Sequence, residues 1–312
     1  MEEKQVFIKK VPANVDGRDF VVGDLHGCFD ELAKLLIHVK FDPTRDRLFS
    51  TGDLIDRGPR SKECLSLLSK QWFFAVLGNH EELLINKIKL IQHDDTEEIS
   101  HDEIEYIQSL VNFVPYILEM PLVYEIEHLL HGKIYIVHSE ILPEHIYSFQ
   151  DEDISGPEYH KYLEVMKKYD FSNPIENFFN NYREKELPQS LKQKLIWSRK
   201  VVGTFYKDNK ESIENSDFTF MKANAFSQRT KIFCGHNVVP FPMKIGQQYY
   251  IDTGCALGYS AKGMNSPLFS QFGHEFFALS MVDLTTGICY GCISSTDKRG
   301  KVVKLENSLY EI

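Results

Sequence analysis

Short apolar runs alternate with helical spacing over the first 90 residues of this chain. The apolar runs cover residues 19–22, 47–50 and 72–77, and a glycine follows each of them within two positions. Residues 29–39 and 81–91 carry apolar side chains three or four positions apart, which is the spacing of a helix that buries one face. Strands and helices that alternate in this way predict a mostly parallel sheet covered by helices.

The rest of the chain differs from this pattern in two parts: a polar, aromatic segment in the middle and a strand-rich segment after it. Residues 97–114 have the pattern of one further helix. From about residue 140 to residue 195 the chain is polar and aromatic, which predicts a helical insert on one face of the domain rather than a separate domain. Further strand candidates lie at 122–127, 134–137, 231–234, 248–252, 276–282 and 289–294. We therefore expect residues 1–312 to form a single α/β domain with an insert over about 140–195.

The composition limits the classes of partner that this protein can bind. Apolar residues make up 43% of the 312 residues, enough to bury a sizeable core. Lysine and arginine number 35 against 45 aspartate and glutamate residues, and the resulting net charge of −10 disfavours sequence-independent binding to nucleic acid. No apolar run approaches the roughly 20 residues that span a bilayer, and the start lacks the pattern of a signal peptide. We expect a cytoplasmic protein with no membrane partner, and export without an N-terminal signal stays open.

Six cysteines are present, and in a chain of this kind we expect reduced thiols rather than disulfides. Cys289 and Cys292 have the spacing of a zinc-ligand pair. A structural zinc site usually takes two such pairs, and the sequence holds no second one. We therefore favour packing of both side chains in a C-terminal strand over a zinc or redox role.

Metal-binding residue types follow the predicted strands in both halves of the chain. In an open α/β sheet the carboxyl ends of the strands lie together at one edge, so side chains that follow the strands should converge. Any one of these residues alone could be a helix cap, a turn residue or a buried histidine, but the joint pattern points to a site. The ligand-type residues at the strand ends are Asp24, His26, Asp53, Asn79, His138 and His236.

This set of ligand types is chemically coherent. Carboxylate, imidazole and amide oxygen suit divalent manganese, iron or zinc. Six protein ligands are too many for one catalytic ion with open positions, but they suit two ions about 3.5–4 Å apart that share a bridging carboxylate. Such a pair acidifies a bridging water and neutralises the oxygens of a phosphate. The strand ends therefore predict a two-metal phosphoester hydrolase.

Three segments carry a resemblance to a known family. Residues 23–27 (GDLHG), 52–58 (GDLIDRG) and 78–81 (GNHE) resemble, in order and residue by residue, the signature blocks of the phosphoprotein phosphatase family of calcineurin-like metallophosphoesterases. The resemblance is strong over about residues 19–91 and weaker at 134–138, 196–199 and 231–258. It implies an α/β/β/α sandwich of two packed mixed sheets flanked by helices.

The resemblance also implies a role for each ligand. Asp53 would bridge two divalent metal ions, with Mn²⁺ expected and Fe or Zn as alternatives. The first ion would be held by Asp24, His26 and Asp53, and the second by Asp53, Asn79, His138 and His236. His128 and His131 are rivals for the place of His138, and His274 is a rival for that of His236. We prefer His138 and His236 because each directly follows a predicted strand or the glycine after it.

Four further residues receive catalytic roles from the resemblance. Arg57 would clamp the phosphate, since a guanidinium matches phosphate oxygens. His80 would protonate the leaving oxygen, and Asp56 would orient His80 and stabilise its charged form. The segment 195–199 (LIWSR) resembles the block that holds a second phosphate-binding arginine in bacterial and phage members, which favours Arg199 over Arg229. The attack would be in line, by a metal-bridging hydroxide, with no phosphoenzyme.

The fourth block departs from the family. The family usually has a small residue or glycine after the histidine, whereas Ser139 and Glu140 follow His138 here. A glutamate at this place could repel a phosphate or could face away. An extra loop over about 258–275 could line a substrate groove or pack against the domain.

These observations favour a protein phosphatase that acts on phosphoserine or phosphothreonine. The expected partner is a phosphoprotein substrate, with no nucleic acid as a main partner. A diadenosine tetraphosphatase-like dinucleotide polyphosphate hydrolase and a phosphotyrosine-directed enzyme fit the same site. An inactive binding scaffold is the alternative from another class, and the full set of ligand types disfavours it.

Overall fold

The computed structural model describes residues 6–142, 178, 180, 188–208, 231–245, 248–259, 277–293 and 302–304. It confirms the alternation of strands and helices predicted for the first 90 residues. The three strands pair in parallel, β2 with β3 and β3 with β4. In chain order the elements are β2 (Asp19–Val22), α1 (Phe29–His38), β3 (Arg47–Ser50), α2 (Ser61–Ser66), η1 (Leu67–Ser69), β4 (Phe73–Ala75) and α3 (Asn79–Gln92).

The parallel strands form half of a six-stranded mixed sheet with the order β12-β11-β10-β2-β3-β4. Its other half is antiparallel and comes from the C-terminal part of the chain: β10 (Ala278–Asp283), β11 (Cys289–Ile293) and β12 (Val302–Lys304). β10 pairs with β2, so the end of the chain returns beside its first βα unit. The strands predicted at 276–282 and 289–294 are confirmed, whereas the short β12 was not predicted.

A second six-stranded mixed sheet has the order β1-β5-β6-β7-β9-β8. β6, β7 and β9 run parallel, so their carboxyl ends share one edge. The sequence predicted four of these strands and missed β1 and β8, which are short strands at the two edges of the sheet. The strands are β1 (Ile8–Val11), β5 (Val123–His128), β6 (Gly132–Val137), β7 (Lys231–Cys234), β8 (Met243–Ile245) and β9 (Gln248–Tyr250).

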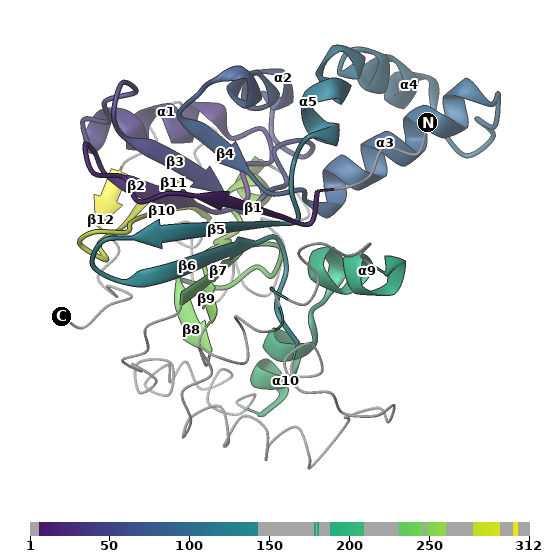
Figure 1. Cartoon of the computed structure of the whole chain (residues 1–312). Coiled ribbons are helices and arrows are strands. Elements are labelled where there is room, and N and C mark those ends of the chain that lie inside the picture. The colour runs from purple at the N-terminus through teal and green to yellow at the C-terminus, as the bar shows by residue number, and fades with distance from the viewer. Residues whose placement is uncertain are drawn as a thin grey trace.

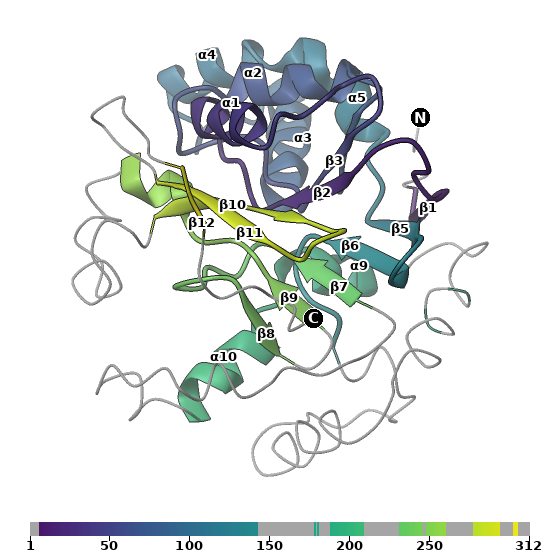
Figure 2. The same cartoon turned by 90° about the vertical axis from the view of Figure 1, so that its left-hand side faces the viewer.

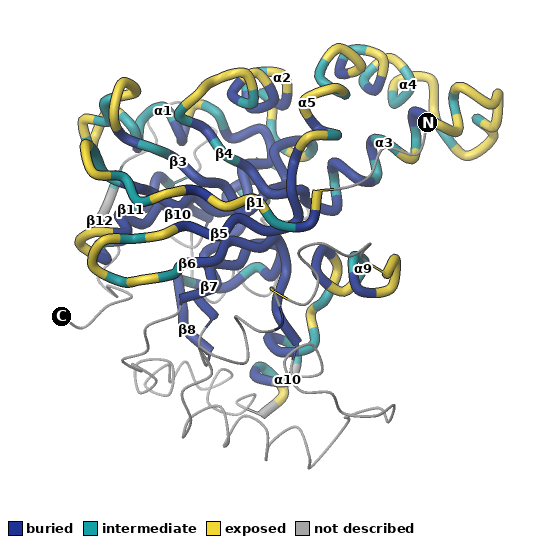
Figure 3. The backbone as a smooth tube through the Cα atoms, viewed as in Figure 1, coloured by how far each residue is buried: buried dark blue, intermediate teal, exposed yellow. Residues whose placement is uncertain are grey.

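The two sheets pack face to face and bury an apolar layer between them (Figure 2). Val21 and Phe49 from the first sheet belong to the same buried cluster as Ile136 and Phe233 from the second. Phe20, next to Val21, faces the helices instead, and it belongs to the cluster that packs under them. Burial on both faces explains why these strands read as continuous apolar runs. In Figure 3 the dark blue, buried chain accordingly runs through the centre of both sheets.

Helices cover the outer faces. Figure 1 shows α1 to α5 over the first sheet, and α9 (Gln189–Trp197) and α10 (Lys200–Asp208) on the side of the second. In α1, Leu32 and Leu35 are buried, acidic residues occupy the first turn and His38 the last, which suits the helix dipole. The predicted α/β/β/α sandwich of two mixed sheets is confirmed.

The single helix predicted over residues 97–114 is wrong in extent. The first helix starts where the Ser100 side chain accepts a hydrogen bond from the backbone of Glu103. Pro115 lies in the first turn of the last helix, where its missing N–H breaks no helical hydrogen bond, so a new helix starts there. The segment forms α4 (His101–Gln108), η2 (Val111–Phe113) and α5 (Val114–Leu118).

The predicted insert over about 140–195 lies mostly outside the described residues, as does most of the loop over about 258–275. The described part of the insert includes most of α9. None of the described helices is both long and apolar enough to cross a lipid bilayer.

Candidate active site

The carboxyl ends of six strands, three from each sheet, meet at one place. β2, β3 and β4 lead into the loops that carry Asp24, Asp53 and Asn79. β6, β7 and β9 of the second sheet lead into His138, His236 and Asp252. The structure thus brings together all six ligand-type residues that the sequence placed at strand ends. Each is at most 5% exposed: Asp24, His26, Asp53, Asn79, His138 and His236.

The first group of ligands centres on Asp53. Its Oδ2 lies 3.4 Å from Nε2 of His26. The other ring nitrogen of His26, Nδ1, is 2.7 Å from the carbonyl oxygen of Ile55, which fixes the tautomer and aims Nε2 at the carboxylate. Ligand atoms of His26, Asp53 and His80 all lie within 4.8 Å of one another. This spacing allows His26 and Asp53 to bind the same cation.

The second group centres on Asn79. Its Oδ1 lies 2.8 Å from Nε2 of His138 and 2.9 Å from Nδ1 of His236. Nδ1 of His138 is 2.7 Å from the carbonyl oxygen of Thr51, so its Nε2 is directed inward. Ligand atoms of Asp53, His138 and His236 also lie within 4.8 Å of one another. Asp53 therefore belongs to both groups, the position that a bridging carboxylate occupies.

Asp24 lies beside both groups. Its Oδ1 accepts a hydrogen bond from Oγ1 of Thr51 at 2.7 Å, and its Oδ2 accepts one from the backbone N–H of His236 at 2.8 Å. Burial, together with the charges of Asp252 and Asp53, holds the pKa of Asp24 well above its ordinary value. Three buried carboxylates at one site repel one another, and divalent cations would offset that repulsion. The donor set therefore fits the metal ions expected from the sequence.

The pKa values of the three histidines predicted as metal ligands, His26, His138 and His236, are all lowered, with burial as the largest cause. Burial lowers the pKa of His26 to about 3. Burial, the neighbouring His138 and the positive charge of Arg199 lower the pKa of His236 to about 2. Neutral imidazole is the form that binds a metal ion.

His80 differs from the other histidines of the site. Its Nδ1 lies 2.5 Å from Oδ2 of Asp56. Burial alone would lower the pKa of His80, but the hydrogen bond with Asp56 and the charge of Asp53 raise it above its ordinary value. Tyr106 of α4 donates to Oδ1 of the same Asp56 carboxylate at 2.9 Å, so both oxygens of Asp56 are held. The arrangement favours an imidazolium, the form that can donate a proton.

Two exposed arginines flank the ligands. Nη1 of Arg57 lies 2.7 Å from Nε2 of His26, and its Nη2 lies 3.1 Å from Nε2 of His80. Arg199 lies in the turn between α9 and α10 and acts electrostatically on His236. The predicted pair of phosphate-binding arginines therefore stands at the rim, one beside each group of ligands.

Glu140 faces away from the ligands, which resolves the two alternatives that the sequence left open. One oxygen of its buried carboxylate accepts hydrogen bonds from Oγ of Ser198 at 2.7 Å and the backbone N–H of Val201 at 2.8 Å. The other accepts one from the hydroxyl of Tyr250 at 3.1 Å. Glu140 therefore caps the start of α10 and holds the turn that carries Arg199.

The backbone at the site is tightly constrained. A Cβ atom at Gly78 would lie 2.2 Å from Oδ1 of Asp53, and one at Gly235 would lie 1.9 Å from Oδ1 of Asp24, so only glycine fits at either place. Among the described residues, seven non-glycine residues have a positive φ angle, which is rare outside glycine, and five of the seven are predicted site residues. Their φ angles are 40° at His26, 47° at Asp53, 69° at Asp56, 66° at Arg57 and 58° at His236.

The sequence assigned no role to one residue that holds the bridging loop. The Glu81 carboxylate accepts hydrogen bonds from the backbone N–H groups of Asp53 at 3.0 Å, Leu54 at 2.7 Å and Gly78 at 3.1 Å. Its place at the third position of α3 is the capping-box position, which was the available signal. Tyr106, in contrast, gave no local signal, because it contacts Asp56 across 50 residues.

The rival residues lie elsewhere where they are described. His128 and His131 stack on each other at the β5–β6 turn, at the opposite end of β6 from His138.

Cys289 belongs to the cluster between the sheets and Cys292 to the cluster under the helices, so the pair cannot bind one ion together. None of the six cysteines, all of which lie in described residues, is paired in a disulfide. Arg229 and His274 lie outside the described residues.

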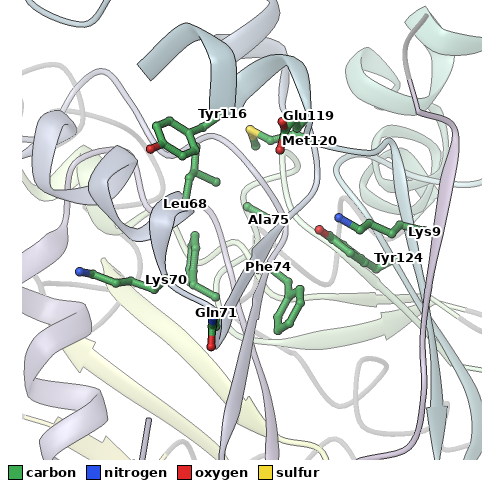
Figure 4. Close-up of a pocket in the computed structure, with 11 residues that line it drawn as sticks. Lys9, Leu68, Lys70, Gln71, Phe74, Ala75, Tyr116, Glu119, Met120 and Tyr124 are labelled. Atoms are coloured by element: carbon green, nitrogen blue, oxygen red, sulfur yellow. The ribbon is translucent and has the colours of Figure 1, made fainter. Parts of the chain in front are cut away.

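A pocket of about 180 Å³ lies apart from these groups (Figure 4). It is formed by the η1–β4 segment, α5 and the strands β1 and β5, and its lining includes Lys9, Lys70, Phe74, Tyr116 and Tyr124. None of the predicted site residues lines it. The pocket therefore has no part in the chemistry of the strand ends.

Comparisons with known proteins point to one family and to two activities. Serine/threonine-protein phosphatase 1 of Salmonella typhimurium is 55% identical to this chain over 67 residues, which are 22% of this chain and 31% of that protein. A symmetrical bis(5'-nucleosyl)-tetraphosphatase of Pasteurella multocida is 32% identical over 169 residues, which are 52% of this chain and 56% of that protein. The matches to these and similar curated relatives span 23–56% of the relatives' lengths.

The fold has a counterpart among solved structures. A crystal structure assigned to a diadenosine tetraphosphatase aligns with 93% of this chain and 99% of its own, with a TM-score of 0.52 and 18% identity, which is a likeness of fold alone. Residues 20–256 match the calcineurin-like phosphoesterase family. Since that match covers most of the 312 residues, this chain belongs to the calcineurin-like phosphoesterase family.

Proposed function

We propose that this protein is a dinuclear metal-dependent phosphoester hydrolase that acts on phosphoserine and phosphothreonine in proteins. The observation that carries the proposal is the meeting of two ligand groups, which share Asp53, with the His80–Asp56 pair and with Arg57. Metal ligands alone would suit many enzymes. A proton donor and an arginine beside them are what cleavage of a phosphate ester requires.

The chain's own residues would hold two ions. Asp24, His26 and Asp53 form one set, and Asp53 shares the second with Asn79, His138 and His236. Mn²⁺ is the expected ion, with Fe or Zn as alternatives. When bound, the two divalent ions supply hydroxide near neutral pH and neutralise phosphate oxygens. The side chains around them keep the site rigid, because the outer ring nitrogens of His26 and His138 bond to backbone carbonyls.

The arginines would bind and orient the phosphate. Arg57 lies between His26 and His80, within 3.1 Å of a nitrogen of each, so a phosphate oxygen that it binds lies next to both imidazoles. Arg199 is held by the turn that Glu140 fixes. A guanidinium offers two parallel N–H groups, which match two phosphate oxygens.

His80 would complete the reaction by protonating the leaving oxygen. Its Nδ1 proton is bound to Asp56, so the proton available for transfer is the one on Nε2. The displacement would be in line and direct, with no phosphoenzyme. A serine or threonine alkoxide is a poor leaving group and needs this proton most, which favours a phosphoserine or phosphothreonine substrate over an aryl phosphate.

A dinucleotide polyphosphate is the second candidate substrate. The observation that favours it is the length of the match to the symmetrical tetraphosphatase of Pasteurella multocida, which covers 52% of this chain against 22% for the Salmonella typhimurium phosphatase. The residues at the strand ends suit either reaction, because both cleave a phosphate ester or anhydride at the same kind of metal site.

The test is a comparison of kcat/KM for the full-length protein loaded with Mn²⁺. The substrates are a phosphoserine/phosphothreonine peptide, a phosphotyrosine peptide and diadenosine tetraphosphate. Asp53→Asn, purified in parallel, controls for contaminating phosphatases. A preference for the phosphoserine/phosphothreonine peptide supports the proposal. A preference for the dinucleotide or for phosphotyrosine overturns the substrate but keeps the chemistry, and metal binding without turnover of any substrate would point to a binding scaffold.

A further inference from the structure

A separate group of ligand-type side chains lies behind the candidate active site. Sγ of Cys28, Sγ of Cys255 and a carboxylate oxygen of Glu31 all lie within 4.8 Å of one another. Each of the three residues is at most 2% exposed. Cys28 and Glu31 are at the start of α1, directly after the loop that carries His26, and Cys255 opens η3 (Cys255–Tyr259) after β9.

Glu31 is the unusual member of this group. Its Oε1 accepts a hydrogen bond from the hydroxyl of Tyr259 at 2.5 Å. Its Oε2 is buried and has no hydrogen-bond partner. A buried carboxylate oxygen without a partner is costly, and a cation is the group that would satisfy it best. The two neighbouring sulfur atoms indicate which cation that would be, because thiolates select soft metal ions.

We propose that Cys28, Glu31 and Cys255 bind a structural zinc ion, separate from the catalytic pair of metals. Each thiol would give up its proton to solvent as it binds, because the thiolate is the ligand. Cys292 of β11 belongs to the same buried cluster as Cys28 and Cys255.

The position of this site indicates that the ion would stabilise the local structure. It would join the start of α1 to η3, two segments that are distant in sequence and that follow the strand-end loops of β2 and β9. Asp24 of the first loop and Asp252 of the second are the carboxylates that repel each other at the active site. A zinc ion behind them would hold the two loops at a fixed spacing.

Cobalt substitution tests the proposal without any measurement of activity. The full-length protein is stripped of metal under reducing conditions and titrated with Co²⁺, which gives an intense near-ultraviolet charge-transfer band only when thiolate binds it. We expect the band in the wild type, its loss in Cys28→Ser and in Cys255→Ser, and its displacement by Zn²⁺. Cys289→Ser is the matched control, because Cys289 is a buried cysteine of β11 that belongs to the other cluster. Asp53→Asn should retain the band, since it alters only the catalytic ligands.

Zinc-edge X-ray absorption of the wild type covers the case in which a cysteine variant fails to fold. We expect a sulfur shell at about 2.3 Å, which the nitrogen and oxygen ligands of the active site cannot supply. Absence of that shell, or absence of the cobalt band in the wild type, would overturn the proposal. A band that survives both Cys28→Ser and Cys255→Ser would overturn it as well.

Discussion

Nδ1 of His80 lies 2.5 Å from Oδ2 of Asp56, and this contact joins the GNHE segment to the loop after β3. The second oxygen of Asp56 is held from a third direction by the hydroxyl of Tyr106, on α4. The proton donor of the proposed reaction is therefore positioned by a chain of contacts that ends on a helix outside the sheets.

Tyr106→Phe tests that chain of contacts. Loss of the hydroxyl frees one oxygen of Asp56 and loosens His80, so we expect kcat on a phosphoserine peptide to fall roughly 10-fold with KM unchanged. The loss should be smaller on 4-nitrophenyl phosphate, whose leaving group needs less protonation. Tyr116→Phe is the matched control, because Tyr116 is a surface tyrosine of the neighbouring α5. Equal losses on both substrates would mean that Tyr106 does not act through His80.

Asp53→Asn should lower the metal content of the protein. Asp53 belongs to both ligand groups, and an asparagine lacks the charge that a bridging ligand supplies. We expect about two ions per chain in the loaded wild type and a loss of at least one in the variant, measured by elemental analysis after dialysis. His80→Asn, which removes no predicted ligand, should keep both. Full metal content in Asp53→Asn would contradict the bridging role.

Glu140→Gln should weaken the binding of the substrate phosphate by Arg199. The amide can replace only one of the two carboxylate oxygens that hold Ser198, Val201 and Tyr250, so the turn that carries Arg199 loosens. We expect a fall in kcat/KM of roughly 10–100-fold with metal content unchanged. The effect should shrink when Arg199 is already alanine, and a double-mutant cycle measures this. Additive losses would show that Glu140 does not act through Arg199.

The acid stability of the domain should depend on Asp46. Burial would raise the pKa of Asp46, but its hydrogen bonds with Arg18, the closest at 2.6 Å, lower it below the ordinary value of 3.8. The ionised carboxylate thus stabilises the fold above about pH 4, and this contribution is lost as the pH falls through the folded-state pKa. Asp46→Asn should lower the free energy of unfolding by about 1–3 kcal/mol at neutral pH.

Urea unfolding of the wild type and Asp46→Asn at pH 7 and about pH 3 measures this difference. The gap between the two proteins should narrow at the lower pH, because the Asp46 carboxylate of the unfolded chain binds a proton below its ordinary pKa and the stabilisation begins to be lost. A gap of the same size at both pH values would mean that the charge on Asp46 contributes nothing to stability.

The elements with the clearest sequence signals are those buried on both faces. β2 and β3 have the predicted bounds, because each is a short apolar run that ends at a glycine-marked turn and is buried on both faces. β1 and β8 gave no such signal, since short edge strands depend on their neighbours for pairing. The helix predicted over 97–114 was wrong in extent, because α4 already ends at Gln108 and the chain continues as the short η2 and α5.

In the site, too, some features had a clear sequence signal and others had none. That the six ligand-type residues lie together could be predicted, because each follows a strand and parallel strands bring their ends together. The residues that position them could not. Tyr106 reaches Asp56 across 50 residues, and Glu140 reaches Val201 across 61, so only the folded chain shows these contacts. The cysteine cluster was hidden for the same reason: Cys28 and Cys255 meet only through the return of the second half of the chain to the first.

The most direct test of the account is the dependence of rate on the leaving group in the wild type and in His80→Asn. A series from 4-nitrophenyl phosphate through phenyl phosphate to a phosphoserine peptide spans good to poor leaving groups. If His80 protonates the leaving oxygen, the variant should lose about 10²–10⁴ in kcat on the phosphoserine peptide and far less on 4-nitrophenyl phosphate, with its metals retained. A loss of the same size across the series, or no loss on the peptide, would contradict the account.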